Sequence, residues 1–265
     1  MAGKFITFEG LDGCGKSTQL SKLALSLRER GLAVLTTREP GGTGVGEKIR
    51  GILLDSRTTK LSALAEMGLM FASRAQLLDE VIFPALQVGT WVLCDRFTDS
   101  SEAYQGGGRG LGSAAVLAMH QIMCRGMQPD LTILMVSDIS DSVARARRRN
   151  LRRPAALEGA PSTPGDSVAT RSPDERAEGQ AGDADRESSG AEPVSAVVAA
   201  SDENRFEREN KEFFKRTFDA YLAIAERDTE RVVKIDALRS IADVQQQIFS
   251  VVEARFGEDL PEHLR

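Results

Sequence analysis

Gly10-Leu11-Asp12-Gly13-Cys14-Gly15-Lys16-Ser17-Thr18 is the stretch of sequence that decides the fold. It follows an apolar run at 5–8 and precedes a segment with helical periodicity at 19–30. The two outer glycines, separated by four residues and followed by Lys-Ser, have the spacing of a phosphate-binding loop. Such glycines let backbone N–H groups turn toward a phosphate, and the helix N-terminus adds partial positive charge. A glycine-rich turn without a ligand is the alternative, but strand, loop, Lys-Ser and helix in this order favour phosphate binding.

All nine loop residues are therefore candidates for contact with a nucleotide. Lys16 is expected to reach the β- and γ-phosphates, and the Ser17 hydroxyl is expected to bind Mg²⁺. The apolar run at 91–94 ends in Asp95. A carboxylate in that place, downstream of a phosphate-binding loop, is the usual second residue of the metal site, acting through water or through Ser17.

Composition limits the class of protein. The chain has 265 residues, of which 41% are hydrophobic, and a formal net charge of −5 with a pI near 5.3. A net negative charge argues against a protein that binds nucleic acid or an anionic membrane as its general partner. The three cysteines are widely spaced and predict reduced thiols, not a metal site or disulfides. No apolar run approaches membrane-spanning length and little sequence precedes the first strand, so we expect a cytoplasmic protein.

Apolar runs and helical segments alternate along the whole chain. Strands are predicted at 5–8, 34–37, 91–94, 131–136 and 232–235. Helices are predicted at 19–30, 46–54, 61–86, 113–125, 139–150, 206–227 and 241–256. This order predicts an α/β fold, a doubly wound five-stranded parallel sheet flanked by helices, in one domain over 1–265.

Two polar segments follow predicted strands, where open α/β sheets bind ligands. Pro and Gly in the segment 38–43 predict a loop, and it carries Glu39. The segment 98–110 is dense in hydrogen-bonding side chains and ends in glycines expected to be flexible. A solvated loop is possible, but its place directly after Asp95 and Arg96 favours a substrate-contacting segment.

The region after residue 140 differs in composition. Arg145, Arg147, Arg148 and Arg149 lie on one predicted helix. A solvated basic face or a nucleic-acid patch is the alternative, but their place beside a nucleotide site favours groups that close over the triphosphate. Residues 152–201 contain no aromatic residue and are rich in Ala, Gly, Ser, Pro and acids, so we expect a disordered insertion. Together these features predict a lid at about 141–210 that contains the insertion.

The chain closely resembles the thymidylate kinase family in its bacterial form. The matching motifs lie at 9–18, 38–43, 71–76, 95–97, 103–110, 213–217 and 235–237. No Asn-Lys-x-Asp motif is present, which counts against a GTPase switch protein. The resemblance implies a P-loop kinase fold, ATP and Mg²⁺ as phosphoryl donor and cofactor, dTMP as acceptor, and a homodimer.

The resemblance also implies roles for single residues. Arg50 and Arg96 would clamp the dTMP phosphate, and Arg74 would hydrogen-bond thymine. Tyr104 would crowd the sugar 2′ position, and Phe71 would stack on the base, although many relatives place that aromatic residue where this chain has Met70. The full implied substrate set is Asp12, Glu39, Arg50, Phe71, Arg74, Arg96, Ser100, Ser101, Tyr104 and Gln105.

The position of Cys14 points to the version of the family whose catalytic arginines come from the lid, because other versions carry a basic residue there. The implied catalytic set is Asp12, Lys16, Arg96, Arg147 and Arg149, with Arg145 among the ATP contacts and Arg205 as a further lid arginine. Three alternatives stay open: a kinase of dUMP or deoxynucleosides, a nucleotide-binding regulator without transfer activity, and an arginine-rich arm that binds RNA or protein.

Overall fold

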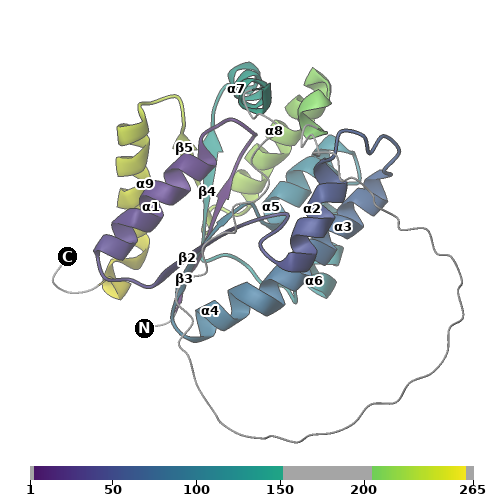
Figure 1. Ribbon diagram of the computed structural model, residues 1–265. Helices are drawn as coiled ribbons and strands as arrows, with labels where there is room; N and C mark the ends of the chain where they lie inside the picture. The colour runs from purple at the N-terminus through teal and green to yellow at the C-terminus, as the bar shows by residue number, and fades with distance from the viewer. Residues whose placement is uncertain (1–2, 152–204, 261–265) are drawn as a thin grey trace, which may run out of the picture. The chain divides into compact units, whose positions relative to one another are not determined.

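The computed structural model describes residues 3–151 and 205–260. Its centre is a parallel sheet of β1 (Phe5–Glu9), β2 (Val34–Arg38), β3 (Trp91–Asp95), β4 (Leu131–Val136) and β5 (Val232–Asp236). The strand order is β2-β3-β1-β4-β5, so β1 lies in the middle and its loop opens at the centre of the sheet (Figure 1). The predicted strands are confirmed, and four of the five extend by one residue at the carboxyl end.

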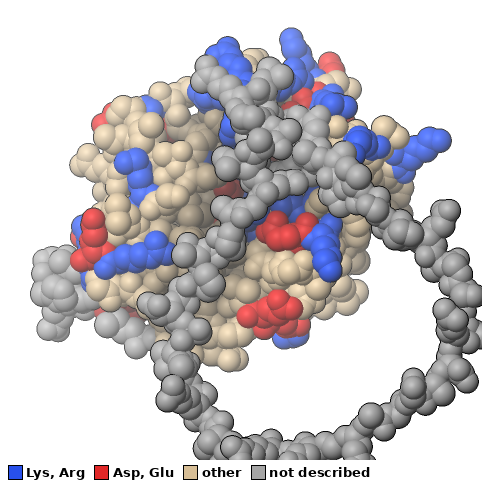
Figure 2. All heavy atoms as spheres, viewed as in Figure 1, with Lys and Arg blue, Asp and Glu red and all other residues tan. Residues whose placement is uncertain are grey.

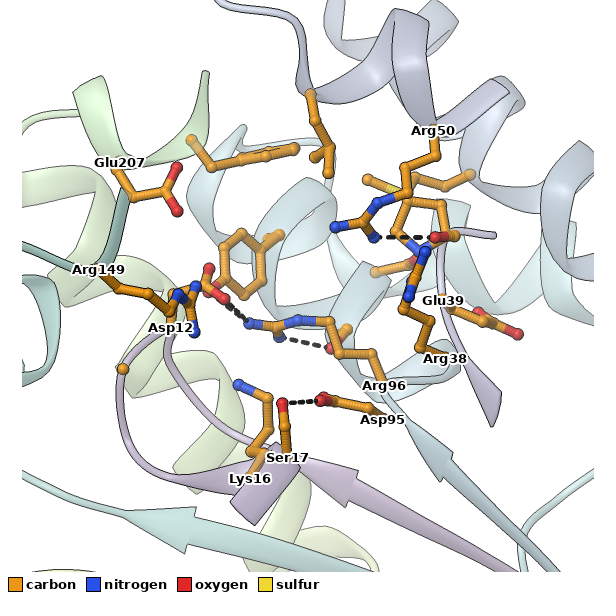
Figure 3. Close-up of a pocket in the computed structure, with 18 of the residues that line it drawn as sticks. Asp12, Lys16, Ser17, Arg38, Glu39, Arg50, Asp95, Arg96, Arg149 and Glu207 are labelled. Atoms are coloured by element: carbon orange, nitrogen blue, oxygen red, sulfur yellow. Dashed lines mark hydrogen bonds and ion pairs between the residues drawn. The ribbon is translucent and has the colours of Figure 1, made fainter. Parts of the chain in front are cut away.

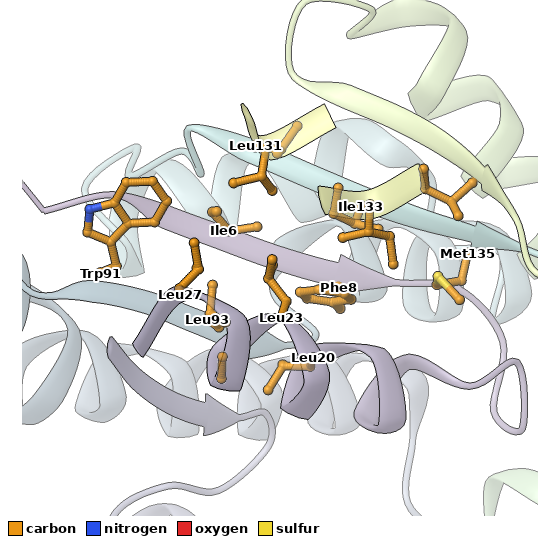
Figure 4. Close-up of a cluster of buried hydrophobic side chains, with 14 of the residues drawn as sticks. Ile6, Phe8, Leu20, Leu23, Leu27, Trp91, Leu93, Leu131, Ile133 and Met135 are labelled. Atoms are coloured by element: carbon orange, nitrogen blue, oxygen red, sulfur yellow. The ribbon is translucent and has the colours of Figure 1, made fainter. Parts of the chain in front are cut away.

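One face of the sheet is covered by α1 (Lys16–Glu29) and α9 (Ile241–Phe256) (Figure 1). Because side chains alternate along a strand, Ile6 and Phe8 of β1 point to this face and pack against Leu23 and Leu27 of α1 (Figure 4). Phe5 packs in a second apolar cluster, which does not include Ile6 or Phe8. Burial on both faces explains why the strands read as nearly continuous apolar runs.

The other face carries the remaining helices. These are α2 (Gly44–Leu54), α3 (Ala63–Leu77), α4 (Phe83–Gln87), α5 (Thr98–Ser101), α6 (Ser113–Met123), α7 (Ile139–Leu151) and α8 (Lys211–Arg227), with the 3-10 turn η3 (Phe206–Arg208). A second 3-10 turn, η4 (Gly257–Asp259), directly follows α9. The helix predicted at 61–86 is interrupted by a π-helical turn, η1 (Leu78–Ile82). The helix predicted from residue 206 begins instead at Lys211, where the Asn210 side chain accepts a hydrogen bond from Phe213 N.

The sequence predicts flexible glycines at the end of the segment 98–110, but the structure places Gly106, Gly107 and Gly108 in a helical element. Residues 102–108 form a second π-helix, η2 (Glu102–Gly108), and most of its residues are buried. The segment is ordered by α8: a Cβ on Gly107 would lie 2.7 Å from Ala220 Cβ, and one on Gly108 2.6 Å from Thr217 Oγ1. These glycines therefore allow a close helix contact, which local sequence does not reveal.

The predicted insertion at 152–201 and most of the predicted lid lie outside the described residues, so those predictions stand as made. Within the described ranges, none of the helices is long and apolar enough to cross a membrane. On the face shown in Figure 2, basic and acidic side chains both lie among uncharged residues.

Candidate active site

The loop between β1 and α1 takes a path that requires glycine. Gly10, Gly13 and Gly15 all have positive φ, at 127°, 84° and 102°. A Cβ at Gly13 would lie 2.1 Å from the carbonyl oxygen of Ser142, which excludes any larger residue. In the described structure no side chain caps the first turn of α1, and no acidic residue lies in it. The turn therefore offers N–H groups and the positive end of the helix dipole to an anion.

Lys16 lies in this loop and is almost fully buried. Its Nζ donates to the carbonyl oxygens of Gly10 at 3.1 Å and Leu11 at 2.9 Å. The ammonium group is thus held against the inside of the loop. Since Lys16 also lines the adjoining cavity, it is placed to exchange these carbonyls for phosphate oxygens.

Ser17 and Asp95 meet across the gap between α1 and β3. The Ser17 hydroxyl donates to Asp95 Oδ2 at 2.6 Å (Figure 3). A hydroxyl and a carboxylate are hard oxygen ligands that suit Mg²⁺. Within the described part of the chain, no group of three or more His, Cys, Asp or Glu side chains could hold a metal ion by itself. This donor set fits Mg²⁺, which keeps water ligands and is completed by substrate phosphates.

Arg96 is the most connected side chain of the site. Its Nη2 donates to Asp12 Oδ1 at 2.7 Å and to the Tyr104 hydroxyl at 3.3 Å (Figure 3). Burial alone would raise the pKa of Asp12, but the charges of Arg96 and Lys16 outweigh it and hold that pKa well below its ordinary value. Asp12 is therefore a carboxylate at neutral pH, facing the same cavity as Arg96.

Arg74 and Glu39 form an ion pair in the floor of the cavity. Arg74 Nε lies 2.5 Å from Glu39 Oε2, and both side chains are 2% exposed. Arg74 Nη2 donates to the Phe97 carbonyl at 3.1 Å and to Ser101 Oγ at 3.0 Å. Among the described residues, Nη1 of Arg74 has no hydrogen-bond partner, although it is buried. A buried donor without a partner costs free energy unless a ligand accepts from it.

These groups surround one cavity of about 660 Å³, a size suited to small-molecule ligands. Most of the predicted site residues line it. They are Asp12, Gly13, Gly15, Lys16, Ser17, Thr18, Glu39, Arg50, Arg74, Asp95, Arg96, Ser100, Ser101, Tyr104, Gln105, Arg145 and Arg149. The cavity thus joins the loop and the carboxyl ends of β2 and β3 to α3 and η2.

Five predicted residues are not among those that line the cavity: Gly10, Leu11, Cys14, Phe71 and Arg147. Phe71 is fully buried, and its ring packs against Arg74, whose Cζ lies 4.7 Å from the ring centroid. The neighbouring Met70 lines the cavity in its place. Neighbouring side chains on a helix point about 100° apart, so Met70 can face the cavity while Phe71 faces the protein interior.

The predicted lid arginines separate in space. Arg145 Nε donates to the Gly13 carbonyl at 2.9 Å, and Arg149 lies near Asp12 (Figure 3). Arg147 turns the other way and donates to the Glu207 carbonyl at 2.9 Å. Arg205 pairs with the buried Glu66 at 2.7 Å. Arg145 and Arg149 therefore face the cavity, while Arg147 connects α7 to η3 and Arg205 pairs with α3.

The sequence did not single out several cavity residues as site residues: Arg38, Pro40, Leu54, Phe206 and Glu207. Arg38 stands in the quoted 38–43 motif at the end of β2, so its place at a strand end was an available signal. Behind the cavity lies Glu9, fully buried at the end of β1. Burial and the charge of Asp99 raise the pKa of Glu9 to about 7, against the hydrogen bond from Ser100 and the charge of Arg96.

Comparison with known proteins agrees with this geometry. The family model described as thymidylate kinase matches residues 8–158, more than half of the chain. A thymidylate kinase of Nitrosomonas eutropha is 39% identical over 251 residues, covering 95% of this chain and 93% of the relative. One from Nitrosospira multiformis is 40% identical over 248 residues, covering 94% of this chain and 96% of the relative.

A solved structure is also similar. The crystal structure of thymidylate kinase from Ehrlichia chaffeensis has a TM-score of 0.63 and 25% identity, and the match covers 96% of this chain and 99% of that one. The sequence relatives span nearly the whole of this chain, and the solved structure has a similar fold. The chain belongs to the thymidylate kinase family.

Proposed function

We propose that this protein transfers the γ-phosphate of ATP to dTMP and releases ADP and dTDP. The observation that carries the proposal is the meeting of two half-sites in one cavity. The loop with Lys16, Ser17 and Asp95 is suited to a triphosphate. The buried set around Arg74 is suited to a nucleotide base. Arg96 contacts Asp12 of the loop (Figure 3) and also Ser100, another residue of the cavity wall.

The donor half-site would bind the phosphates of ATP. Backbone N–H groups of the loop, the start of α1 and the Lys16 ammonium all offer hydrogen bonds or positive charge. Ser17 and Asp95 would hold Mg²⁺, which when bound neutralises phosphate charge and orients the donor. Arg145 and Arg149 border the same space and would add charge near the transferred group.

The acceptor half-site would bind dTMP. Arg74 Nη1 is a buried donor that a base carbonyl could satisfy, and Gln105 and Ser101 also line the cavity. Buried polar groups that pair with one base discriminate strongly, because an unmatched base leaves them unpaired. Met70 lines the cavity and offers an apolar contact for the ring. Arg50 and Arg96 would hold the phosphate.

The transfer requires positioning more than proton chemistry. The acceptor oxygen belongs to a phosphate that is ionised at neutral pH, so no strong general base is required. Catalysis would come from aligning acceptor and donor and from stabilising negative charge on the transferred group. Lys16 and Arg96 both line the cavity and would supply positive charge beside the transferred group. Closing the site would exclude water and suppress hydrolysis of ATP.

We extend the proposal to a homodimer. Several large apolar side chains are exposed on helices of one face of the sheet: Ile52 of α2, Leu64 of α3 and Ile122 of α6. α3 packs against both α2 and α6, so these side chains lie on adjoining helices. Exposed apolar residues on adjoining helices are typical of subunit contacts. Sedimentation velocity would report a single species near 28.7 kDa if the proposal is wrong.

The reaction is tested by measuring ADP release with ATP, Mg²⁺ and dTMP, beside dUMP, dCMP and thymidine. We expect turnover that depends on dTMP and falls by at least about 100-fold in Arg96→Ala, the scale for loss of one preorganised charge contact. Faster turnover with dUMP or thymidine would redirect the proposal to another kinase. ATP binding without acceptor-dependent turnover would favour a nucleotide-binding regulator.

A further inference from the structure

Tyr221 of α8 lies behind Arg96, and its hydroxyl has no role in the reaction described so far. The sequence presents it as one of the apolar positions of a helix, and its side chain is 2% exposed. Yet its hydroxyl accepts a hydrogen bond from Arg96 Nη1 at 3.1 Å and donates to Glu9 Oε2 at 3.1 Å. A buried phenol therefore bridges a site arginine and the buried carboxyl group of Glu9.

Ser100 forms a second bridge between the same two groups. Its hydroxyl accepts from Arg96 Nη1 at 2.9 Å and donates to Glu9 Oε2 at 2.5 Å. Each hydroxyl has one proton, so when both protons point to Glu9 both oxygens are left as acceptors for Arg96. Burial raises the pKa of Tyr221 well above its ordinary value, so this hydroxyl keeps its proton.

The backbone of Arg96 shows why such support is needed. Arg96 has a φ of 74°, a left-handed conformation that is costly for a residue other than glycine. Such a conformation persists where surrounding groups hold it. Glu9 takes part here too, because its Oε1 accepts from the backbone N–H of the next residue, Phe97, at 2.7 Å. The carboxyl group of Glu9 thus contacts both the backbone after Arg96 and the two hydroxyls behind the Arg96 guanidinium.

We propose that Tyr221 is a positioning residue for Arg96: its hydroxyl, supported by Glu9 and Ser100, fixes Nη1 so that Nη2 is presented to the cavity. This inference rests on the proposed function, because it assumes that Arg96 contacts the phosphate of the acceptor. The aromatic ring has a separate, structural part, packing edge-on against Tyr104 with centroids 6.3 Å apart. Tyr221→Phe keeps that ring and removes only the hydroxyl.

A double-mutant cycle between Tyr221→Phe and Arg96→Ala tests the inference. The readouts are the dTMP dissociation constant, measured by calorimetry, and kcat and KM for both substrates. With Arg96 present, Tyr221→Phe is expected to weaken dTMP binding by about ten-fold, the scale of one hydrogen bond to a charged group, and to lower kcat with KM for ATP unchanged. In the Arg96→Ala background it is expected to change dTMP binding by less than about two-fold, because its partner is gone.

Thr217→Val is the matched control. Thr217 is a buried hydroxyl residue one turn earlier on α8, and its Oγ1 donates to the Phe213 carbonyl of the same helix at 2.9 Å. The control is expected to leave the dTMP affinity unchanged in both backgrounds. Glu9→Gln, taken through the same cycle, gives a second reading if Tyr221→Phe folds poorly.

The outcomes separate the two proposals. Equal losses from Tyr221→Phe in both backgrounds, or no loss beyond that of Thr217→Val, would overturn the positioning role while leaving the reaction standing. If Arg96→Ala itself left dTMP binding and turnover unchanged, the role of Arg96 in the proposed function would fail first, and the inference with it.

Discussion

At the scale of single residues, Arg74 shows how a buried cation can be held for a ligand. Three of its contacts, to Glu39, Phe97 and Ser101, fix the guanidinium plane and leave Nη1 buried without a partner among the described residues. A lysine has a single ammonium group and cannot reproduce this fork. If Arg74 recognises the base, as proposed, the orientation of its donors matters as well as its charge.

We therefore expect Arg74→Lys to raise KM for dTMP by about ten-fold or more while KM for ATP changes little, since one directed hydrogen bond to a charged group is lost. Steady-state kinetics with each substrate varied in turn measures this. Arg125→Lys is the matched control, because Arg125 is an exposed arginine paired with Asp79 on the surface. Equal changes in both KM values for Arg74→Lys would speak against a role in base recognition.

What the sequence predicted at this scale depended on local spacing. Lys16, Ser17 and Asp95 were predicted because loop spacing and strand ends are local patterns, and the structure brings all three to one cavity. Phe71 was favoured over Met70, but periodicity cannot resolve adjacent positions on a helix, and packing decided it. The role of the Tyr221 hydroxyl could not be predicted, because its partners Arg96 and Glu9 lie 125 and 212 residues away in the sequence.

At the scale of elements, the contact between η2 and α8 supports the part of the cavity wall that we propose binds dTMP. η2 carries Tyr104 and Gln105 of the cavity, and α8 carries Tyr221. A Cβ at Gly108 would lie 2.6 Å from both Phe213 Cε2 and Thr217 Oγ1. The two elements therefore approach closely only because this position lacks a side chain. Alternation of strands and helices predicted the sheet, but this contact depends on residues more than 100 positions apart in the sequence.

Gly108→Ala should push α8 away from η2. We expect it to lower the free energy of unfolding by about 1–3 kcal/mol, the usual cost of overpacking, and to weaken dTMP binding through Gln105 and Tyr104. Gly106→Ala is the matched control in the same π-helix, because its Cβ would meet no atom closer than 3.4 Å among the described residues. Urea denaturation and dTMP titration of both variants check this. Equal stability of the two variants would contradict the packing argument.

At the scale of the whole molecule, positive charge is concentrated where the ligand phosphates would bind. The chain has a formal net charge of −5, yet basic side chains outnumber acidic ones along the described cavity wall. The field that attracts nucleotides is therefore local. The acidic remainder of the chain disfavours adventitious polyanions. Burying a carboxyl group such as Glu9 near these arginines also makes the free energy of unfolding depend on pH.

Glu9 should make the folded protein less stable as pH rises from about 4.5 to about 7. Its pKa is 4.5 in a solvated chain and is raised to about 7 in the fold by burial and by Asp99, opposed by Ser100, Arg96 and the Phe97 N–H. In that range the folded protein keeps a proton that the unfolded chain releases, so the free energy of unfolding falls by up to about 1.4 kcal/mol per pH unit. Glu9→Gln cannot titrate and should remove this slope.

Chemical denaturation of both proteins between pH 4.5 and 8 measures the slope. The difference between wild type and Glu9→Gln should change across pH 4.5–7 and become constant above that range, because the wild-type carboxyl is then ionised in both states. Glu253→Gln, at an exposed position of α9, controls for the loss of a surface carboxylate. Parallel curves for wild type and Glu9→Gln would mean that Glu9 ionises in the fold as it does in solvent. In that case burial would not raise the pKa of Glu9, and the carboxyl group behind Arg96 would not keep its proton at pH 4.5–7.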